Sequence, residues 1–275
     1  MKTIVAPTDF SPVSLNAVNY AADLACAIDA QLSLLHVCMN PVEVSEIAVP
    51  AYGALDLIND AEERMSKLNN EIVTRTRGRI KIYTQVAKGD IMSLIDRHCK
   101  AVHPYAVVMG AESSGPFERF LFGGKAISAV KKLSWPVMVI PQGITFSGIR
   151  KIGLACDLNN VIHTVNFEEI KNLVSAFKAS LHILHVRPDD GSIYTAEVIE
   201  ESAALQTAFE DLKPLYYYLR DKNIDERICE FAEKHQLDLL IIIPKDHDLI
   251  ERIFKHSHSE SIVLHTHVPL MAIHE

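Results

Sequence analysis

The sequence predicts an α/β fold made of two consecutive open parallel sheets, and three observations lead to this prediction. Short apolar runs without polar alternation, such as LSLLHVC at 32–38, are typical of strands buried on both faces. These runs alternate with segments whose apolar residues recur every three or four positions, as they do in helices. The whole order then recurs after Gly143 in a chain of 275 residues, about twice the usual size of one domain.

The first repeat begins with an apolar strand that ends in the turn at 7–9, and Ser11 then fits the N-cap of a helix. The dipeptide Gly89-Asp90 predicts the start of a later helix in the same way. The expected order alternates strands at 2–6, 32–38, 80–86, 105–109 and 136–140 with helices at 11–28, 61–76, 90–101 and 123–133. Strands that alternate with helices indicate a parallel sheet.

The second repeat follows the same order with a shorter middle. Asp9 recurs as Asp157, 148 positions later, whereas Pro136 recurs as Pro269, only 133 positions later. We expect strands at 151–155, 181–186, 237–243 and 269–273, and helices at 157–178, 195–212, 225–235 and 257–264. The predicted domains therefore span residues 1–143 and 148–275, and the linker between them lies near 141–150.

Composition and charge limit the classes of function. Apolar residues make up 48% of the chain and charged residues 23%, which is typical of a folded globular protein. The net charge of −8 arises after residue 143, because the first 143 residues hold 14 basic and 14 acidic side chains and the rest hold 13 and 21. This balance disfavours nucleic acid as a partner. No apolar stretch approaches the ~20 residues of a membrane span, and the amino terminus lacks a signal-peptide pattern, so we expect a cytoplasmic protein without membrane contact.

The candidate ligand-binding residues follow the strands of the first repeat. In an open parallel sheet, ligands bind beyond the carboxyl ends of the strands, where the strand order reverses. Pro7, Thr8 and Asp9 follow the first strand, and Val37 ends the second. The loop at 110–124 follows the fourth strand and contains four glycines. A glycine-rich loop that leads into a helix suits a phosphate group, although glycines also serve ordinary turns.

Several motifs together resemble the universal stress protein family in its tandem form, with two domains in one chain. They are PTDFS at 7–11, LLHV at 34–37, Gly89-Asp90, VVMG at 107–110, ERFLFGG at 118–124 and WPVMVIP at 135–141. The resemblance covers nearly the whole chain. It implies two Rossmann-like domains of the adenine nucleotide alpha hydrolase-like type, with five strands each, and a role in the stress response. It also implies ATP in the first domain, with adenine near Asp9 and Val37 and the triphosphate along Gly110 to Lys125.

Two departures from the family's phosphate motif weaken this expected site. ATP-binding members carry glycine, two residues, glycine, nine residues, glycine and then serine or threonine; here Ser113 replaces the second glycine and Gly124 replaces the hydroxyl residue. Loss of the hydroxyl contact costs about 1 kcal/mol, and Gly115 lies close enough to substitute for the missing glycine in a shifted loop. The nucleotide site implied by the resemblance comprises Pro7, Thr8, Asp9, Val37, Met109, Gly110, Ser113, Gly123, Gly124 and Lys125.

The matching loop of the second repeat, PKDHDLIERIFKHSHS at 244–259, departs much further from the motif. Pro244, His247 and His256 stand in place of the three glycines, and Ser257 keeps the hydroxyl position. Proline also removes a backbone N–H donor. We therefore expect no triphosphate site in the second domain and interpret it as a structural or regulatory partner of the first.

Histidines gather near the carboxyl terminus, where six of the 13 fall within the last 29 residues: His247, His256, His258, His265, His267 and His274. Converging histidines bind zinc, copper or nickel, but this spacing matches no standard zinc motif. We expect polar loop and helix-end positions, with a metal site as the alternative. His36 and His185 are expected to be hydrogen-bonded histidines at strand ends.

The sequence contains no nucleophile elbow, no Walker loop and no evident cysteine–histidine pair, so we predict no enzymatic activity. The leading hypothesis is a cytoplasmic stress-response protein that binds or senses ATP in its first domain. The alternative is a nucleotide-free scaffold or protein-interaction module. The closing strands at 136–140 and 269–273 are short and apolar, and exposed edges of this kind invite pairing. We expect the two domains to pack through them as an internal pseudo-dimer, and the resemblance implies a homodimer of tandem chains.

Overall fold

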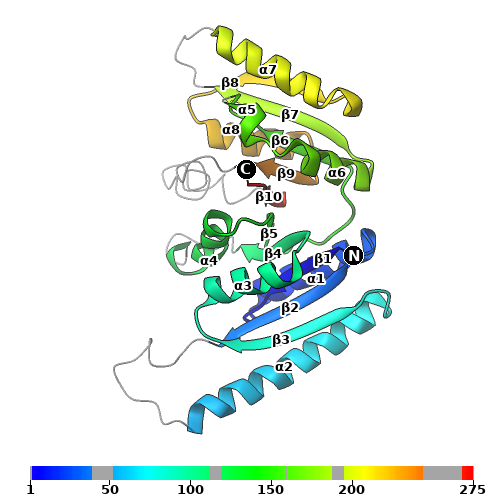
Figure 1. The fold of residues 1–275 in the computed structure, drawn as a ribbon, viewed down its shortest axis with the longest axis vertical. Coiled ribbons are helices and arrows are strands. Elements are labelled where there is room, and N and C mark those ends of the chain that lie inside the picture. Colours follow the sequence, from blue (N-terminus) through cyan, green and yellow to red (C-terminus); the bar gives the residue numbers. More distant parts are fainter. Residues whose placement is uncertain are drawn as a thin grey trace. The chain divides into compact units, whose positions relative to one another are not determined.

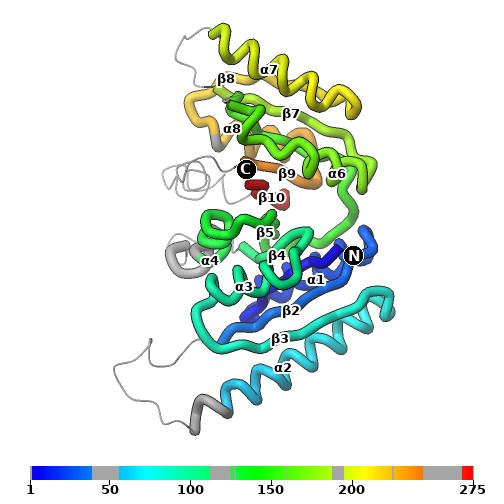
Figure 2. The backbone as a smooth tube through the Cα atoms, viewed as in Figure 1, coloured from blue at the N-terminus to red at the C-terminus, as the bar shows by residue number. Residues whose placement is uncertain are grey.

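The computed structural model describes residues 2–38, 52–111, 119–158, 160–187, 195–243 and 268–274 (Figure 1). Strands alternate with helices along both halves of the chain, which confirms the predicted α/β fold (Figure 2). The predicted helix at 257–264 lies outside the described residues. Among the helices that are described, none combines the length and apolarity that crossing a membrane requires.

The first repeat, residues 1–143, contains nine helices and strands within the described ranges. They are β1 (Thr3–Pro7), α1 (Pro12–Ala27), β2 (Gln31–Cys38), α2 (Tyr52–Thr76), β3 (Ile82–Lys88), α3 (Ile91–Val102), β4 (Ala106–Ala111), α4 (Arg119–Lys132) and β5 (Val137–Pro141). The strands are parallel and lie in the order β3-β2-β1-β4-β5. Because parallel crossovers are right-handed, α1 and α2 cover one face of this sheet and α3 covers the other. The strand order reverses between β1 and β4.

The second repeat, residues 148–275, has the same topology. Its described elements are β6 (Lys151–Ala155), α5 (Val161–Thr164), α6 (Phe167–Phe177), β7 (Ser180–Arg187), α7 (Ala196–Ala208), the 3-10 helix η2 (Glu210–Leu212), β8 (Leu215–Arg220), α8 (Ile224–Lys234), β9 (Leu239–Ile242) and β10 (Leu270–Ala272). The strands are again parallel, in the order β8-β7-β6-β9-β10. β8 takes the place that β3 has in the first repeat, so each described sheet has the five strands that the family resemblance implies.

The predicted helix starts are confirmed where a capping side chain marks them. Ser11 Oγ accepts a hydrogen bond from the Ser14 amide at 3.2 Å, and Pro12 follows at the first helical position of α1. Asp90 caps α3 by accepting from the Ser93 amide at 2.8 Å. These two caps fix the entry of α1 and α3 relative to the strands that precede them.

Two helices differ from their predicted extents. α4 begins at Arg119 rather than at Gly123, so the segment that precedes the paired glycines is already helical. The helix predicted from 157 to 178 is divided into α5 and α6, and Asn166 caps the second piece by accepting from the Glu169 amide. In the second case the side-chain cap of Asn166 marks a helix start that the spacing of apolar residues does not show.

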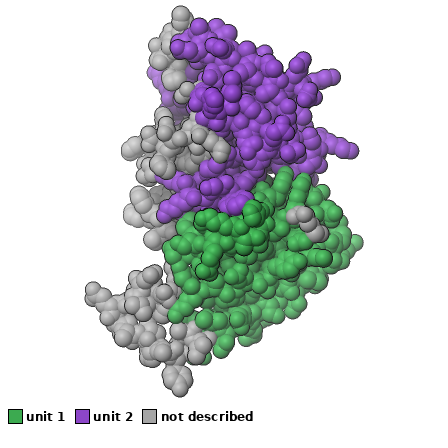
Figure 3. All heavy atoms as spheres, in the orientation of Figure 1, with its two compact units in different colours: residues 1–111, 137–146 green, residues 112–136, 147–275 purple. Residues whose placement is uncertain are grey.

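Packing divides the chain differently from the sequence repeats (Figure 3). One compact unit comprises residues 1–111 and 137–146, and the other comprises 112–136 and 147–275. α4 therefore belongs to the first repeat by sequence and to the second unit by packing. Within that unit, His274 Nε2 lies 2.6 Å from the backbone oxygen of Val130, in the last turn of α4. The carbonyls of a last helical turn lack partners within the helix, so His274 satisfies one of them.

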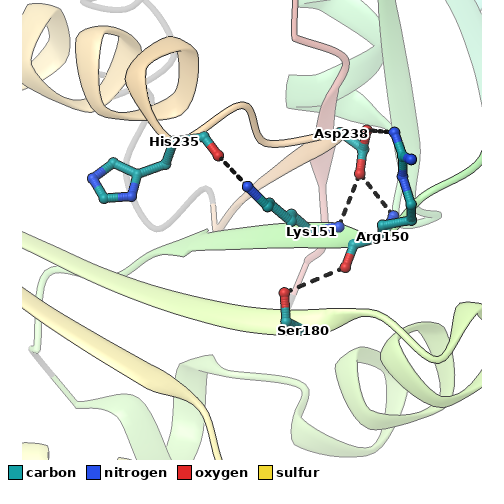
Figure 4. A network of polar contacts seen from close by, with 5 residues as sticks. All are labelled: Arg150, Lys151, Ser180, His235 and Asp238. Atoms are coloured by element: carbon teal, nitrogen blue, oxygen red, sulfur yellow. Dashed lines mark hydrogen bonds and ion pairs between the residues drawn. The ribbon is translucent and has the colours of Figure 1, made fainter.

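A polar network around Asp238 fixes the first residues of β6 (Figure 4). The Asp238 carboxylate accepts hydrogen bonds from the backbone amides of Arg150 at 2.7 Å and Lys151 at 2.9 Å. Lys151 Nζ donates to the backbone oxygen of His235 at 2.9 Å, and Ser180 Oγ donates to the backbone oxygen of Arg150 at 3.3 Å. The amino-terminal edge of the second sheet is thus held by side chains from three segments of the chain.

Candidate functional site

The turn that follows β1 lies at the point where the strand order of the first sheet reverses, which is where open parallel sheets bind ligands. Pro7 is the last residue of β1 and is buried, as is Thr8, whereas Asp9 is exposed to solvent. The structure therefore brings Asp9, as predicted, to the carboxyl edge of the sheet beside the end of β2.

Hydrogen bonds within the turn fix the orientation of Asp9. The Thr8 amide donates to the backbone oxygen of Leu35 at 2.9 Å, and Thr8 Oγ1 accepts from the Phe10 amide at 3.0 Å. Asp9 Oδ1 in turn accepts from the Ser11 amide at 3.0 Å. One carboxylate oxygen of Asp9 is thus held by the backbone at the start of α1, and the exposed side chain is presented in a defined direction.

His36 supports this turn from the neighbouring strand. Its Nδ1 lies 2.8 Å from the backbone oxygen of Thr8, which agrees with the prediction of a hydrogen-bonded histidine at a strand end. The ring of Phe10 packs on His36 with 4.6 Å between ring centroids. On Phe10 lies the guanidinium of Arg64 from α2, 4.4 Å from the ring centroid. The contact between Phe10 and Arg64 could not be predicted, because the two residues are 54 positions apart and no motif links them.

The other predicted residues of the first unit line the same edge. Val37 is partly exposed near the end of β2, and Met109 is buried near the end of β4. Gly110 follows Met109 and packs against α1: a Cβ atom placed there would lie 2.6 Å from the backbone oxygen of Val13. A close approach of α1 to β4 therefore accounts for glycine at this position, whatever a ligand requires.

The remaining predicted residues are not brought together with these in one compact unit. Gly123, Gly124 and the partly exposed Lys125 lie inside α4, which packs with the second unit. Because the helix begins at Arg119, the backbone donors free of intrahelical bonds belong to its first turn, ahead of Gly123. Ser113 lies outside the described residues, so the predicted phosphate loop is described only at its two ends.

The turn after β6 repeats the geometry of the turn after β1. The Cys156 amide donates to the backbone oxygen of Leu184 at 2.9 Å, and His185 Nδ1 lies 2.9 Å from the backbone oxygen of Cys156. Leu158 has a positive φ of 54°, as Phe10 has a φ of 62°. The prediction that His185 is a hydrogen-bonded strand-end histidine is thus confirmed.

The surroundings of this second turn are different in charge and burial. Burial lowers the pKa of His185, and Arg187 lowers it further, while the bond to Cys156 and the charge of Asp157 act in the opposite direction. Glu201 of α7 accepts a hydrogen bond from the Val161 amide at 2.7 Å, so a carboxylate of the protein occupies the start of α5. The predicted loop residues Pro244, His247, His256 and Ser257 lie outside the described residues.

Each of the two repeats matches a known protein family on its own. The family model described as the universal stress protein family matches residues 1–141 and, a second time, residues 148–274. The chain belongs to the universal stress protein family. The two matches agree with the repeats read from the sequence, and they make this chain a tandem universal stress protein.

Individual universal stress proteins support this assignment. One from Methanocaldococcus jannaschii is 31% identical over 144 residues, which is 51% of this chain and 82% of that protein. The crystal structure of one from Archaeoglobus fulgidus covers 99% of this chain and 96% of its own, with a TM-score of 0.73 and 17% identity. A putative member from Pseudomonas aeruginosa covers 99% and 93%, with a TM-score of 0.58 and 14% identity. At such identities the two solved structures show a common fold.

Metal-binding groups do not gather in the part of this universal stress protein that the structure describes, where no three histidine, cysteine or acidic side chains converge. Of the six histidines near the carboxyl terminus, only His274 is described, and its Nε2 is engaged by Val130. The other five lie outside the described residues, so both the loop interpretation and the metal alternative stay predictions.

Proposed function

We propose that this universal stress protein binds an adenine nucleotide, specifically ATP, at the carboxyl edge of its first repeat. The observation that carries the proposal is the orientation of Asp9, which is exposed at the switch point of the sheet and held there by the Ser11 amide. The motif PTDFS, on which this turn is built, is one of those through which the chain resembles the nucleotide-binding members of the family. Val37 and Gly110 lie at the ends of the two strands that flank β1.

The second repeat has the same fold, and its described residues place an additional carboxylate beside the equivalent turn. Its turn carries Asp157 like the first, but Glu201 occupies the start of the helix that follows. The negative charge of Glu201 beside this turn disfavours an anionic ligand there, and the loop at 244–259 has Pro244, His247 and His256 in place of the three glycines of the motif. We therefore assign nucleotide binding to the first repeat alone.

We propose further that the protein acts by binding and not by catalysis, and that it works in the cytoplasm. Asp9 and His36 are both engaged in the turn by backbone groups. The internal pseudo-dimer of the two repeats and a homodimer of whole chains stay predictions. The alternative function, a nucleotide-free scaffold, is favoured by the departures at Ser113 and Gly124.

Isothermal titration calorimetry of the purified chain with ATP and Mg²⁺ tests the proposal. We expect saturable binding, together with a rise in Tm, since a ligand that binds only the folded state stabilises it. Asp9→Ala should abolish the heat of binding. Asp157→Ala is the matched control, because it removes the same side chain from the equivalent turn of the second repeat, and binding should persist. If millimolar ATP produces neither a heat of binding nor a thermal shift, the nucleotide-free scaffold is favoured.

A further inference from the structure

Histidine and aromatic side chains pack together on one face of the second sheet, near the amino-terminal ends of its outer strands. His182 of β7 and Tyr217 of β8 stack with 5.8 Å between ring centroids and 7° between ring planes. Phe231 of α8 and His235, the C-cap of that helix, pack on Tyr217 at centroid distances of 4.6 and 5.1 Å. We call these four residues the His182 cluster. Through it, the edge strand β8 contacts both β7 and α8.

Both ring nitrogens of the buried His182 are bonded to hydroxyl groups. Nε2 lies 3.2 Å from Ser180 Oγ, and Nδ1 lies 3.3 Å from Tyr217 Oη. Because the Ser180 hydroxyl donates its proton to the backbone oxygen of Arg150, we assign it as the acceptor of a proton on Nε2. Nδ1 then accepts from the Tyr217 hydroxyl. This arrangement fits neutral His182 and satisfies both of its ring nitrogens.

The charged groups around His182 disfavour a second proton on its ring. Burial lowers the pKa of His182, and the charges of His235 and Lys151 lower it further. Lys151 Nζ is held beside the cluster by its bond to the backbone oxygen of His235 (Figure 4). The carboxylate of Asp238, which belongs to the same network, accepts from the amides of Arg150 and Lys151. Within the described ranges, no carboxylate is bonded to His182 that could offset an added charge.

His235 is subject to the same effects. Burial lowers the pKa of His235, and the positive charges of Lys234 and Lys151 lower it further. The two histidine rings are 6.4 Å apart between centroids, so a proton on one ring repels a proton on the other. The closed cluster therefore favours two neutral histidines.

A proton on His182 disrupts the hydrogen bonds of the closed cluster. Nδ1 becomes a donor that faces the hydroxyl proton of Tyr217, and the part of the chain that the structure describes offers this hydroxyl no second acceptor. In an open cluster, water accepts from the hydroxyl and hydrates the charged imidazole. The open form therefore binds protons more tightly than the closed form, and a falling pH favours opening.

The first repeat provides an internal contrast. Ser33 of β2 stands 149 positions before His182, and its hydroxyl lies 2.8 Å from Nε2 of His98 in α3. Burial alone lowers the pKa of His98, without a contribution from neighbouring charges. In the pairing with the second strand, Gln85 of β3 has the register position that Tyr217 has in β8. The first repeat thus has a buried histidine but lacks the stack on its edge strand and the second histidine.

We propose that the His182 cluster is a pH-sensitive contact that holds β8 and the end of α8 on the second sheet at neutral pH and releases them on acidification. The inference does not depend on nucleotide binding, since the cluster lies in the second repeat, near the amino-terminal ends of β7 and β8. It assigns to this repeat a local conformational change that protons control.

Hydrogen exchange measured by mass spectrometry at about pH 7 and about pH 5.5 tests the proposal, after correction for the intrinsic effect of pH on exchange. Amides of β8 and of the last turn of α8 should lose protection at the lower pH. The loss should reach up to about tenfold for each histidine that gains a proton on opening, given an ordinary pKa of ~6.5 in the open form. The edge strand β3 is the internal reference and should change less. An equal loss in β3 and β8 would indicate general acid destabilisation and overturn the proposal.

Substitutions identify the titrating group. His182→Gln removes the ring that gains a proton and supplies an uncharged amide that can bond to hydroxyl groups, so β8 should stay protected at about pH 5.5. His98→Gln is the matched control, because it changes the buried histidine of the first repeat, and it should leave the release of β8 as in the wild type. His235→Gln removes one of two titrating rings and should show a smaller release. If β8 is released in His182→Gln as in the wild type, the proposal is wrong.

An NMR titration of the histidine rings in the wild type decides the matter if His182→Gln does not fold. The release of β8 should follow the protonation of His182 as the pH is lowered. A release that is complete while the His182 ring is still neutral would overturn the proposal. Protonation of His182 without any loss of protection in β8 would overturn it equally.

Discussion

The turns after β1 and β6 have the same backbone and different side chains. In each turn the first residue, Thr8 or Cys156, donates its amide to the second strand in sequence and has its carbonyl oxygen within hydrogen-bond distance of a histidine. The third residue of each turn has a positive φ. The side chains differ at the residue with the positive φ, which is Phe10 in the first turn and Leu158 in the second. The backbone path of the turn therefore belongs to the fold, whereas the side chains around it differ between the two repeats.

The largest expected effect comes from Gly110, whose place in the second repeat is taken by Pro244. In Gly110→Ala the new Cβ would lie 2.6 Å from the backbone oxygen of Val13, and relief requires α1 to move away from β4. We expect a loss of about 1–3 kcal/mol in the free energy of unfolding, measured by urea titration.

A comparison substitution in the second repeat is Gly153→Ala in β6, which also adds a Cβ to a glycine inside a strand. Its Cβ would contact the Leu237 side chain, whose terminal methyl group can rotate, so the loss should be clearly smaller. Equal losses for the two alanine variants would mean that the approach of α1 to β4 is not as tight as described.

A smaller effect is expected at the cap that starts α1, directly after the turn that follows β1. Ser11→Ala removes the oxygen that accepts from the Ser14 amide, and loss of such a cap costs about 1 kcal/mol. Thermal unfolding followed by circular dichroism should show a lower Tm. Ser14→Ala keeps the amide and the cap, so it should cost less; the reverse ranking would assign the stabilisation to the Ser14 hydroxyl and its contact with Thr8.

The smallest effect is expected from protonation of His185 in the second turn. Burial is the main reason that its folded-state pKa lies below the ordinary value, so the unfolded chain takes up its proton first as the pH falls. The stability that this histidine contributes is complete above its unfolded pKa of ~6.5 and is lost as the pH decreases from there through its lower folded-state pKa.

His185→Gln should therefore reduce the drop in Tm between about pH 7 and pH 5, measured by scanning calorimetry at closely spaced pH values. His163→Gln removes an exposed histidine from α5 and serves as the control. An acid-induced drop that is the same in His185→Gln and in the wild type would show that this side chain does not take part.

The order of the elements could be predicted from the sequence because local signals mark it. Ser11 and Asp90 are capping residues at the places expected, and the fully apolar strands have the predicted limits to within one or two residues. The strand β8 could not be predicted, since its sequence LYYYLR places three tyrosines in succession and hides the alternation of a half-exposed edge strand. The early start of α4 was hidden by Gly123 and Gly124, which indicate a turn when read locally.

Some residues of the candidate site could be predicted from the sequence and others could not. Pro7, Thr8, Asp9 and Val37 were predictable, because the carboxyl ends of parallel strands meet at one edge whatever their side chains. Arg64 was not, because its place on Phe10 depends on the packing of α2 against α1, and the sequence gives no sign of contact between residues 54 positions apart. Glu201 was missed for the same reason.

The membership of α4 in the second compact unit bears on how this protein can be taken apart. A gene fragment that stops at residue 143 follows the sequence repeat, yet it separates α4 from the residues at 147–275 with which it packs. The bond from His274 to Val130 would be lost as well, leaving a last-turn carbonyl without that donor. The two sequence repeats are therefore not separate packing units, and the smallest piece expected to keep every described helix in place is the entire tandem chain.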